Sequence, residues 1–270
     1  MKITNKILAA GTALLAATVL FAGCGDIIDA NDANKNSSIE YTNENETGTY
    51  REWNTTNFKH SSASAVITIE DPSDSGYKDE SGDGVMGIAW QLTESKNDDG
   101  DKLSSFYIVG VKVMNNKVYY YISSVKDCTQ TGLTESSDFE NETQIVPTTG
   151  TFAELGNVSD YKNSDENVQV GIKVEPVISE NQNDDGTYDV TFKVTVGKPS
   201  YEGELNKDID LTVSGTKTTV SGLDVTSSNG TTKKITQAKL AYYASVYAGK
   251  TLKGSWQLCD IVNEAEVVED

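Results

Sequence analysis

Cys24 is the residue whose type and position point most directly to a covalent modification. It ends the segment Leu-Phe-Ala-Gly-Cys, which follows an apolar run from Ile7 to Leu20. Two lysines precede that run, and its 14 residues suit an export signal but fall short of the ~20 that span a bilayer. The two small residues before Cys24 suit cleavage by a signal peptidase, so we expect the chain to be exported.

The same segment resembles the lipobox of bacterial lipoproteins, in which the cysteine is lipidated and becomes the mature N-terminus. Phe21 departs from the family pattern, which prefers leucine at that position. The resemblance implies a signal peptide over residues 1–23 and a lipid anchor on Cys24. It places the protein in the bacterial cell envelope, at the outer membrane or cell surface rather than the inner membrane. The alternative is ordinary secretion, with cleavage after Ala22 or Gly23.

Catalytic patterns are scarce in the chain. His60 is the single histidine, and no Gly-x-Ser-x-Gly nucleophile elbow lies near a strand end to work with it. Two-carboxylate glycoside hydrolysis on one strand needs acids at alternate positions, because successive side chains point to opposite faces. Glu70 and Asp71 are adjacent instead. We therefore expect no enzyme activity, and a glycan hydrolase with an unusual site is the alternative.

A loop rich in serine and glycine carries the acidic residues Asp71, Asp74, Asp79 and Asp83. Calcium takes six to eight oxygen ligands, which a flexible acidic loop can supply. The spacing does not match an EF-hand. Calcium is thus the one cofactor to consider, against the alternative of a solvated surface loop.

Cys128 and Cys259 are the two other cysteines of the exported chain. An even number of cysteines in an oxidising compartment favours a disulfide bridge. We predict a bridge between them, and the alternative is two buried thiols on separate strands.

Tyrosines alternate along the segment from Val118 to Ser123. Val118, Tyr120 and Ile122 share one face, and Tyr119 and Tyr121 share the other. If that second face is exposed, the two rings suit stacking on sugars or contact with a protein. Trp53 lies in a polar context and is a third candidate ligand-binding residue. In the alternative, these rings cover a loop or a second core.

Charge narrows the range of partners. The chain carries −19, and removal of the two lysines of the leader leaves −19 − 2 = −21. Such a field repels phosphate backbones, so nucleic acid is excluded as a partner.

The remaining pattern indicates how these residues are positioned. Residues 24–49 are rich in asparagine and acids and read as a polar tether after the lipidated cysteine. Residues 50–270 show apolar residues at every second position, as in Val168–Val174 and Val190–Val196. The sequence Asn-Asp-Asp-Gly occurs at 97–100 and again at 183–186, and its Asp-Gly pair is typical of a hairpin turn. Asn115-Asn116 also indicates a tight hairpin. We predict an all-β, antiparallel β-sandwich of two sheets. The segment Leu240–Ala248 fits a helix and a strand equally well.

The tail from Tyr243 to Trp256 resembles the closing strands of concanavalin A-like, laminin G-like jelly rolls on bacterial surface lipoproteins. Met86–Trp90 and Val118–Ser123 are similar to their inner strands. The resemblance implies a jelly roll, a strand at Leu240–Ala248, and binding of a carbohydrate or an extracellular protein. It carries over no catalytic residue. A structural or antigenic lipoprotein without a small-molecule site is the alternative function.

We predict that Cys24→Ala abolishes lipid attachment and releases or mislocalises the protein. Metabolic labelling with a radioactive fatty acid measures the attachment. Undiminished label on the variant would contradict the lipobox interpretation.

Overall fold

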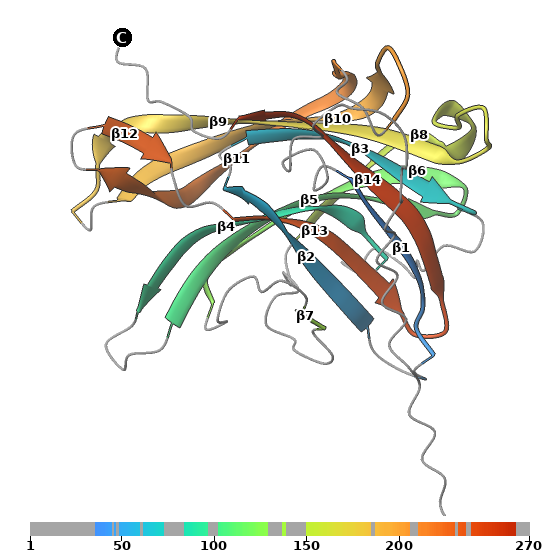
Figure 1. Ribbon diagram of the computed structural model, residues 1–270, viewed down its shortest axis with the longest axis horizontal. Coiled ribbons are helices and arrows are strands. Elements are labelled where there is room, and N and C mark those ends of the chain that lie inside the picture. The colour runs from blue at the N-terminus through green and yellow to red at the C-terminus, as the bar shows by residue number, and fades with distance from the viewer. Residues whose placement is uncertain are drawn as a thin grey trace, which may run out of the picture.

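The computed structural model of the chain describes residues 36–44, 46, 49–59, 62–72, 84–96, 102–128, 137–138, 150–184, 187–205, 210–229, 232–235 and 239–262. These residues form two antiparallel sheets that pack face to face as a β-sandwich (Figure 1). Within this part of the chain, no helix is long and apolar enough to cross a membrane.

In the described part of the chain, each sheet contains seven strands. Sheet A has the spatial order β1 (Asn36–Thr42), β14 (Thr251–Val262), β3 (Ser62–Glu70), β9 (Val168–Gln182), β10 (Thr187–Ser200), β11 (Thr212–Asn229) and β12 (Thr232–Ile235). Sheet B has the order β7 (Ser137–Asp138), β2 (Thr49–Lys59), β13 (Lys239–Tyr247), β4 (Met86–Lys96), β5 (Lys102–Met114), β6 (Lys117–Cys128) and β8 (Gly150–Asn157). The predicted two-sheet antiparallel fold is confirmed.

The main core lies between the sheets and comes from the apolar residues that alternate along the strands. Trp90 on β4, Tyr107 on β5 and Phe192 on β10 meet there, and the Tyr107 and Phe192 rings stack with centroids 4.7 Å apart. Burial raises the pKa of Tyr107, because its hydroxyl is shielded from water. Trp256 on β14 contacts Tyr242 on β13 at 5.5 Å between ring centroids. Trp90 and Trp256 therefore lie in the main core.

Strand β13 settles the segment that fitted both a helix and a strand. It pairs with β2 on one side and β4 on the other, and Leu240–Val246 is buried at every position. A strand covered on both faces is apolar at successive positions, so it loses the alternation that identifies strands. The strand implied by the jelly-roll resemblance is confirmed at this segment.

The tight turn predicted at Asn115-Asn116 joins β5 to β6. Both residues have positive φ, 51° and 61°, which is the geometry of a two-residue hairpin loop. The carbonyl of Asn116 accepts a hydrogen bond from the backbone N–H of Val158, in the short 3₁₀ helix η2 (Val158–Asp160), at 3.0 Å. The Asp-Gly segments at 97–100 and 183–186 likewise fall between β4 and β5 and between β9 and β10.

The predicted tether is wrong for Asn36–Thr42, which forms β1 at the edge of sheet A. All seven residues pair in register with β14, from Asn36 opposite Gln257 to Thr42 opposite Thr251. Ile39 is buried in the main core. Only Ile39 and Tyr41 of its seven residues pack on the main core, and two such side chains are too few to give a periodic pattern. The sandwich thus begins at least fourteen residues before the predicted boundary at residue 50.

Asn43 fastens the end of β1 to the β13–β14 hairpin. Its buried side-chain amide donates to the carbonyl of Val246 at 3.0 Å, and its backbone N–H donates to the carbonyl of Lys250 at 2.9 Å. The backbone carbonyl of Asn43 accepts a hydrogen bond from the N–H of Gly249 at 2.8 Å. Gly249 has a φ of 69°, which suits glycine in this turn.

We predict that Ile39→Ala lowers the free energy of unfolding by about 2–5 kcal/mol, because it empties a buried position of the main core. Ser38→Ala, on the exposed side of the same strand, is the control and should change stability little. Denaturant unfolding followed by circular dichroism measures both. Equal stability of the two variants would mean that β1 is not part of the folded domain.

Candidate functional site

The face predicted to bind ligand is the outer face of sheet B, which points away from sheet A. A single row of register partners crosses it from β8 to β2: Phe152, Tyr121, Gly110, Gly87, Tyr243 and Trp53. Two aromatic positions thus flank a pair of glycines on each side. The Trp53 backbone lies on β2, but its side chain is outside the described part.

Tyr121 does not lie exposed on this face, so that prediction is wrong. Its side chain is only 1% exposed, and its ring centroid lies 4.7 Å from that of Phe152. It belongs to a second hydrophobic cluster on the outer face of sheet B, together with Val85, Ala89, Ile108, Ala241 and Tyr243. The alternation of β6 correctly separated Tyr121 from Tyr120, but it gave no information on whether the second face is covered.

The two glycines are required by the close approach of β4 and β5. A Cβ atom on Gly87 would lie 2.2 Å from the carbonyl oxygen of Val109, and one on Gly110 would lie 2.3 Å from Cγ1 of Val85. Any larger residue would force the strands apart. The two glycines lie between Tyr121 and Tyr243 in this row and have no side chains to fill the space between the two rings.

Lys112 adds a buried charge next to this row. It is fully buried on β5, and its Nζ lies 4.8 Å from the centroid of the Phe152 ring. An ammonium group over an aromatic face is attracted by the ring quadrupole, which offsets part of the cost of its burial. Ser245 is also buried on this face, and its Oγ accepts a hydrogen bond from the N–H of Val85 at 3.1 Å. No sequence pattern marks Lys112 as buried, because alternation predicts only that it faces away from the main core.

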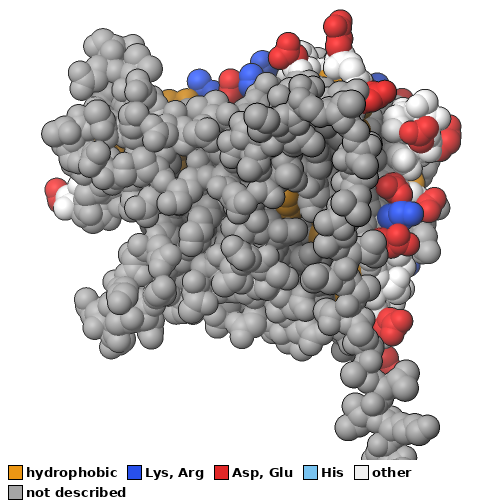
Figure 2. Space-filling model, in the orientation of Figure 1, with side chains coloured by type: hydrophobic (Ala, Val, Ile, Leu, Met, Phe, Trp, Pro, Cys, Tyr) orange, Lys and Arg blue, Asp and Glu red, His pale blue; other side chains and the backbone are white. Residues whose placement is uncertain are grey.

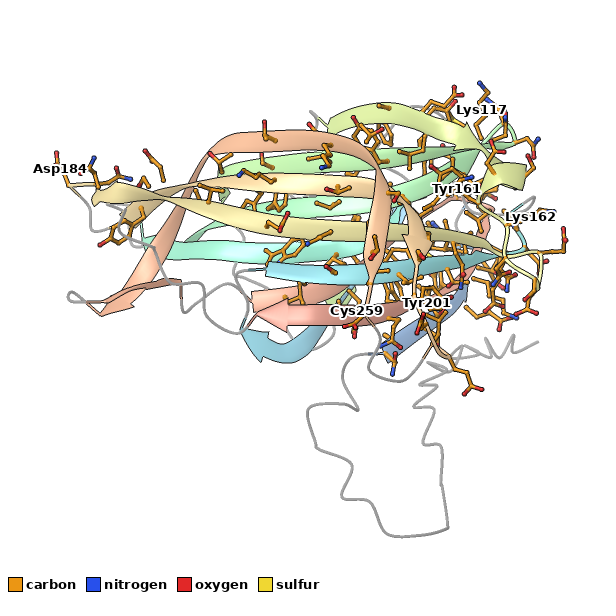
Figure 3. The ribbon with its side chains drawn as sticks, turned by 90° about the horizontal axis from the view of Figure 1, so that it is seen from above. Lys117, Tyr161, Lys162, Asp184, Tyr201 and Cys259 are labelled. Carbon is orange, nitrogen blue, oxygen red and sulfur yellow. The ribbon has the colours of Figure 1, made fainter. Side chains whose placement is uncertain are left out.

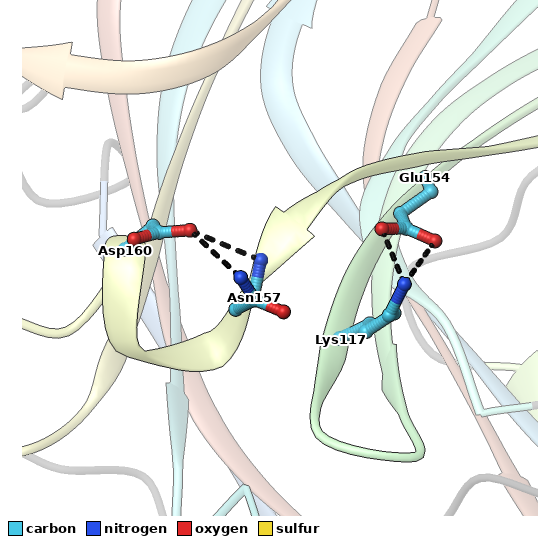
Figure 4. A network of polar contacts seen from close by, with 4 residues as sticks. All are labelled: Lys117, Glu154, Asn157 and Asp160. Carbon is cyan, nitrogen blue, oxygen red and sulfur yellow. Dashed lines mark hydrogen bonds and ion pairs between the residues drawn. The ribbon is translucent and has the colours of Figure 1, made fainter.

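Of the two predicted ligand-binding rings that the structure describes, Tyr119 is the one that retains access to solvent, since it is half-buried. Close to it in the register, Lys117 Nζ contacts both oxygens of Glu154 at 2.7 and 2.8 Å (Figure 4). The hydrogen bond to Glu154 raises the pKa of Lys117. In the same view, the Asp160 carboxylate accepts hydrogen bonds from the backbone and the side-chain amide of Asn157 at 3.2 and 3.4 Å. These polar contacts border the end of sheet B where β5 turns into β6.

Sheet A presents a different outer face. Several of its described charged side chains form ion pairs on the surface, such as Lys253 with Glu70 at 3.3 Å and with Glu40 at 3.7 Å. Figure 2 shows carboxylates along the margin where β1 and β14 lie, with lysines among them. This face is mostly polar, as expected for a sheet surface in water.

The two cysteines predicted to form a bridge belong to different sheets. Cys128 is the last residue of β6 in sheet B, and its side chain is outside the described part. Cys259 on β14 is buried on the outer face of sheet A with Val66 and Leu211, next to Tyr201 of the β10–β11 connection (Figure 3). A disulfide requires the two Cα atoms to lie within ~7 Å of each other. Because the two cysteines lie on strands of different sheets, the fold gives no sign that their Cα atoms are this close. The bridge stays a prediction.

The predicted calcium ligands are mostly outside the described part, which includes only Asp71. Asp71 is exposed and has a φ of 45°. Among the described residues, no group of three or more His, Cys, Asp or Glu side chains could hold a metal ion. The buried polar residues of the described part include no aspartate or glutamate, so they offer no shielded carboxyl group for a general acid. His60 is outside the described part.

The chain matches no family model, no curated protein and no solved structure. The lipobox and the concanavalin A-like resemblance therefore stay predictions, and the arrangement of the residues carries the functional argument.

We predict that Tyr121→Ala destabilises the protein by about 3–5 kcal/mol, as much as Tyr120→Ala, because both rings fill buried positions. Tyr119→Ala, with its half-buried ring, should cost about 1 kcal/mol. Thermal melting of the three variants compares them without knowledge of a ligand. If Tyr121→Ala is as stable as the parent chain, the Tyr121 ring is not buried, and the prediction of an exposed aromatic face on sheet B holds after all.

Proposed function

We propose that the protein is a lipid-anchored component of the bacterial cell envelope whose sandwich is a structural module, without a small-molecule site on sheet B. The lipobox-like segment that ends at Cys24 supports the anchor. The burial of the described central residues of sheet B on both faces supports the structural role. Tyr121 and Tyr243, the aromatic residues best placed for stacking on a sugar, are at most 1% exposed.

Sugar-binding faces need rings that a ligand can reach, because stacking buries the ring against the sugar. Here the rings are packed with alanine, valine and isoleucine side chains, as in a core. The outer face of sheet A offers surface ion pairs and threonines, with no described exposed ring. The outer faces of the two sheets thus favour a structural role over a receptor for small ligands.

A binding role for a glycan or an extracellular protein is the second candidate. Half-buried Tyr119 next to the exposed Lys117–Glu154 pair favours it, since a ring beside charged groups suits a polar ligand. A site of this kind would lie at the end of sheet B rather than along the whole aromatic row.

A binding screen separates the two candidates. The chain from Gly25 to Asp270 is tested on a glycan array and on immobilised matrix proteins, with calcium and with a chelator. We expect no saturable binding to glycans in either condition. Saturable binding that Tyr119→Ala abolishes while circular dichroism shows the variant still folded at the assay temperature, and that Ser164→Ala leaves intact, would overturn the structural role.

A further inference from the structure

Strand β11 leaves a long edge of sheet A open. On one side it pairs with β10 from Thr212 opposite Ser200 to Thr226 opposite Thr187, with one register shift after Val220. On the other side it pairs with β12 only at Ser227 and Asn229. In the part of the chain that the structure describes, the backbone groups of the remaining edge have no strand partner.

The open edge has few of the features that normally block pairing with another strand. Natural proteins protect edges by short length, charges, proline or bulges. From Thr212 to Val220 the strand pairs regularly with β10, contains no proline and carries one charge, Lys217. Six of its residues are exposed: Thr212, Ser214, Gly215, Thr216, Lys217 and Thr219. The first register shift comes only after Val220.

In the described part of sheet B, strand β2 is open beyond the two residues that pair with β7, and it carries Arg51, Glu52 and Lys59. The remaining described edge strands are shorter or irregular. β7 has two residues, β12 has four, and β1 has seven. Strand β8 has a register shift against β6 and a positive φ at Gly156. The β11 edge is therefore the place where the sheet is best prepared to continue into another chain.

We infer that two copies of this chain associate through their β11 edges, antiparallel, to extend sheet A across a two-fold axis. Charge selects this edge for self-association. The whole chain carries −19, so two copies repel each other, yet residues 212–220 include no acidic residue. An isologous contact at this edge brings together the surfaces with the least repulsion.

The segment also fixes the register of the pairing. Thr216 is the middle one of its nine regularly paired residues, so a two-fold axis at Thr216 pairs all of them, with Thr212 opposite Val220. In that register Lys217 of one copy lies opposite Gly215 of the other. An axis at Lys217 would place two lysines directly opposite each other, which is unfavourable.

An edge of nine residues buries less area than a standard stable interface, so the dimer is weak in solution. If both copies are anchored to one membrane, their effective concentration rises and favours pairing without any new contact. The association itself does not depend on the anchor, so its test is independent of the proposed function.

Covalent trapping tests the contact and its register. Thr216→Cys is made in the chain from Gly25 to Asp270 and oxidised, with Ser164→Cys, exposed in a turn far from β11 in sequence, as the control. At the axis, opposed Cα atoms lie about 4.5–5.5 Å apart, which suits a disulfide. We expect at least tenfold more cross-linked dimer from Thr216→Cys. A yield equal to that of the control, as pairing of the edge with a different protein would leave it, overturns the inference.

A second pair of variants measures the association itself. Thr216→Lys places like charges opposite each other at the axis, and Ser164→Lys adds the same charge elsewhere. Sedimentation velocity over a range of concentrations should show dimerisation weakened at least tenfold by Thr216→Lys only, with unchanged circular dichroism. A chain that is monomeric throughout, or a dimer that Thr216→Lys leaves intact, overturns the inference.

Discussion

Sheet B has to be shielded from water on both of its faces. Its inner face supplies Trp90 and Tyr107 to the main core, and its outer face carries Tyr121 and Tyr243 among aliphatic side chains. Burial of aromatic rings is worth several kcal/mol each, so exposure of either face would remove a large part of the stability. The central strands β13, β4 and β5 are consequently fixed from two directions, and sheet A packs against this rigid layer. Lys112 is held in the same layer by the Phe152 ring.

Alternation predicted most of the strands, because one face of each strand is wet or differs in size from the other. It predicted the fold and the face to which Tyr120 points. It failed where the physical cause of alternation is absent. Every position of Leu240–Val246 is buried, so the pattern fitted a helix as well. The prediction that Tyr121 is exposed was wrong because a strand pattern shows only on which face of the sheet a residue lies. Whether that face is covered depends on contacts with residues remote in sequence.

Strand β1 was missed for a related reason. Its place in the sandwich depends on backbone pairing with β14 and on three hydrogen bonds at Asn43, none of which needs an apolar sequence. A polar asparagine-rich segment resembles a tether in composition, although one of its asparagines is fully buried. The burial of Lys112 and the requirement for glycine at Gly87 likewise come from the approach of neighbouring strands. Such positions can be recognised only once the register is known.

The early start of β1 limits how far the sandwich can stand off from a membrane. If the lipid is on Cys24, only eleven residues lie between it and Asn36. Fully extended, that chain spans at most about 40 Å, and the full predicted tether would have spanned about twice as much. An acidic domain on so short a tether would stay close to anionic lipid headgroups. The repulsion between them is screened beyond ~8 Å at physiological salt. With a lipid on Cys24, the standoff height would be set by the point where the chain joins sheet A, and a few residues inserted before Asn36 would change it more than any alteration of the sandwich.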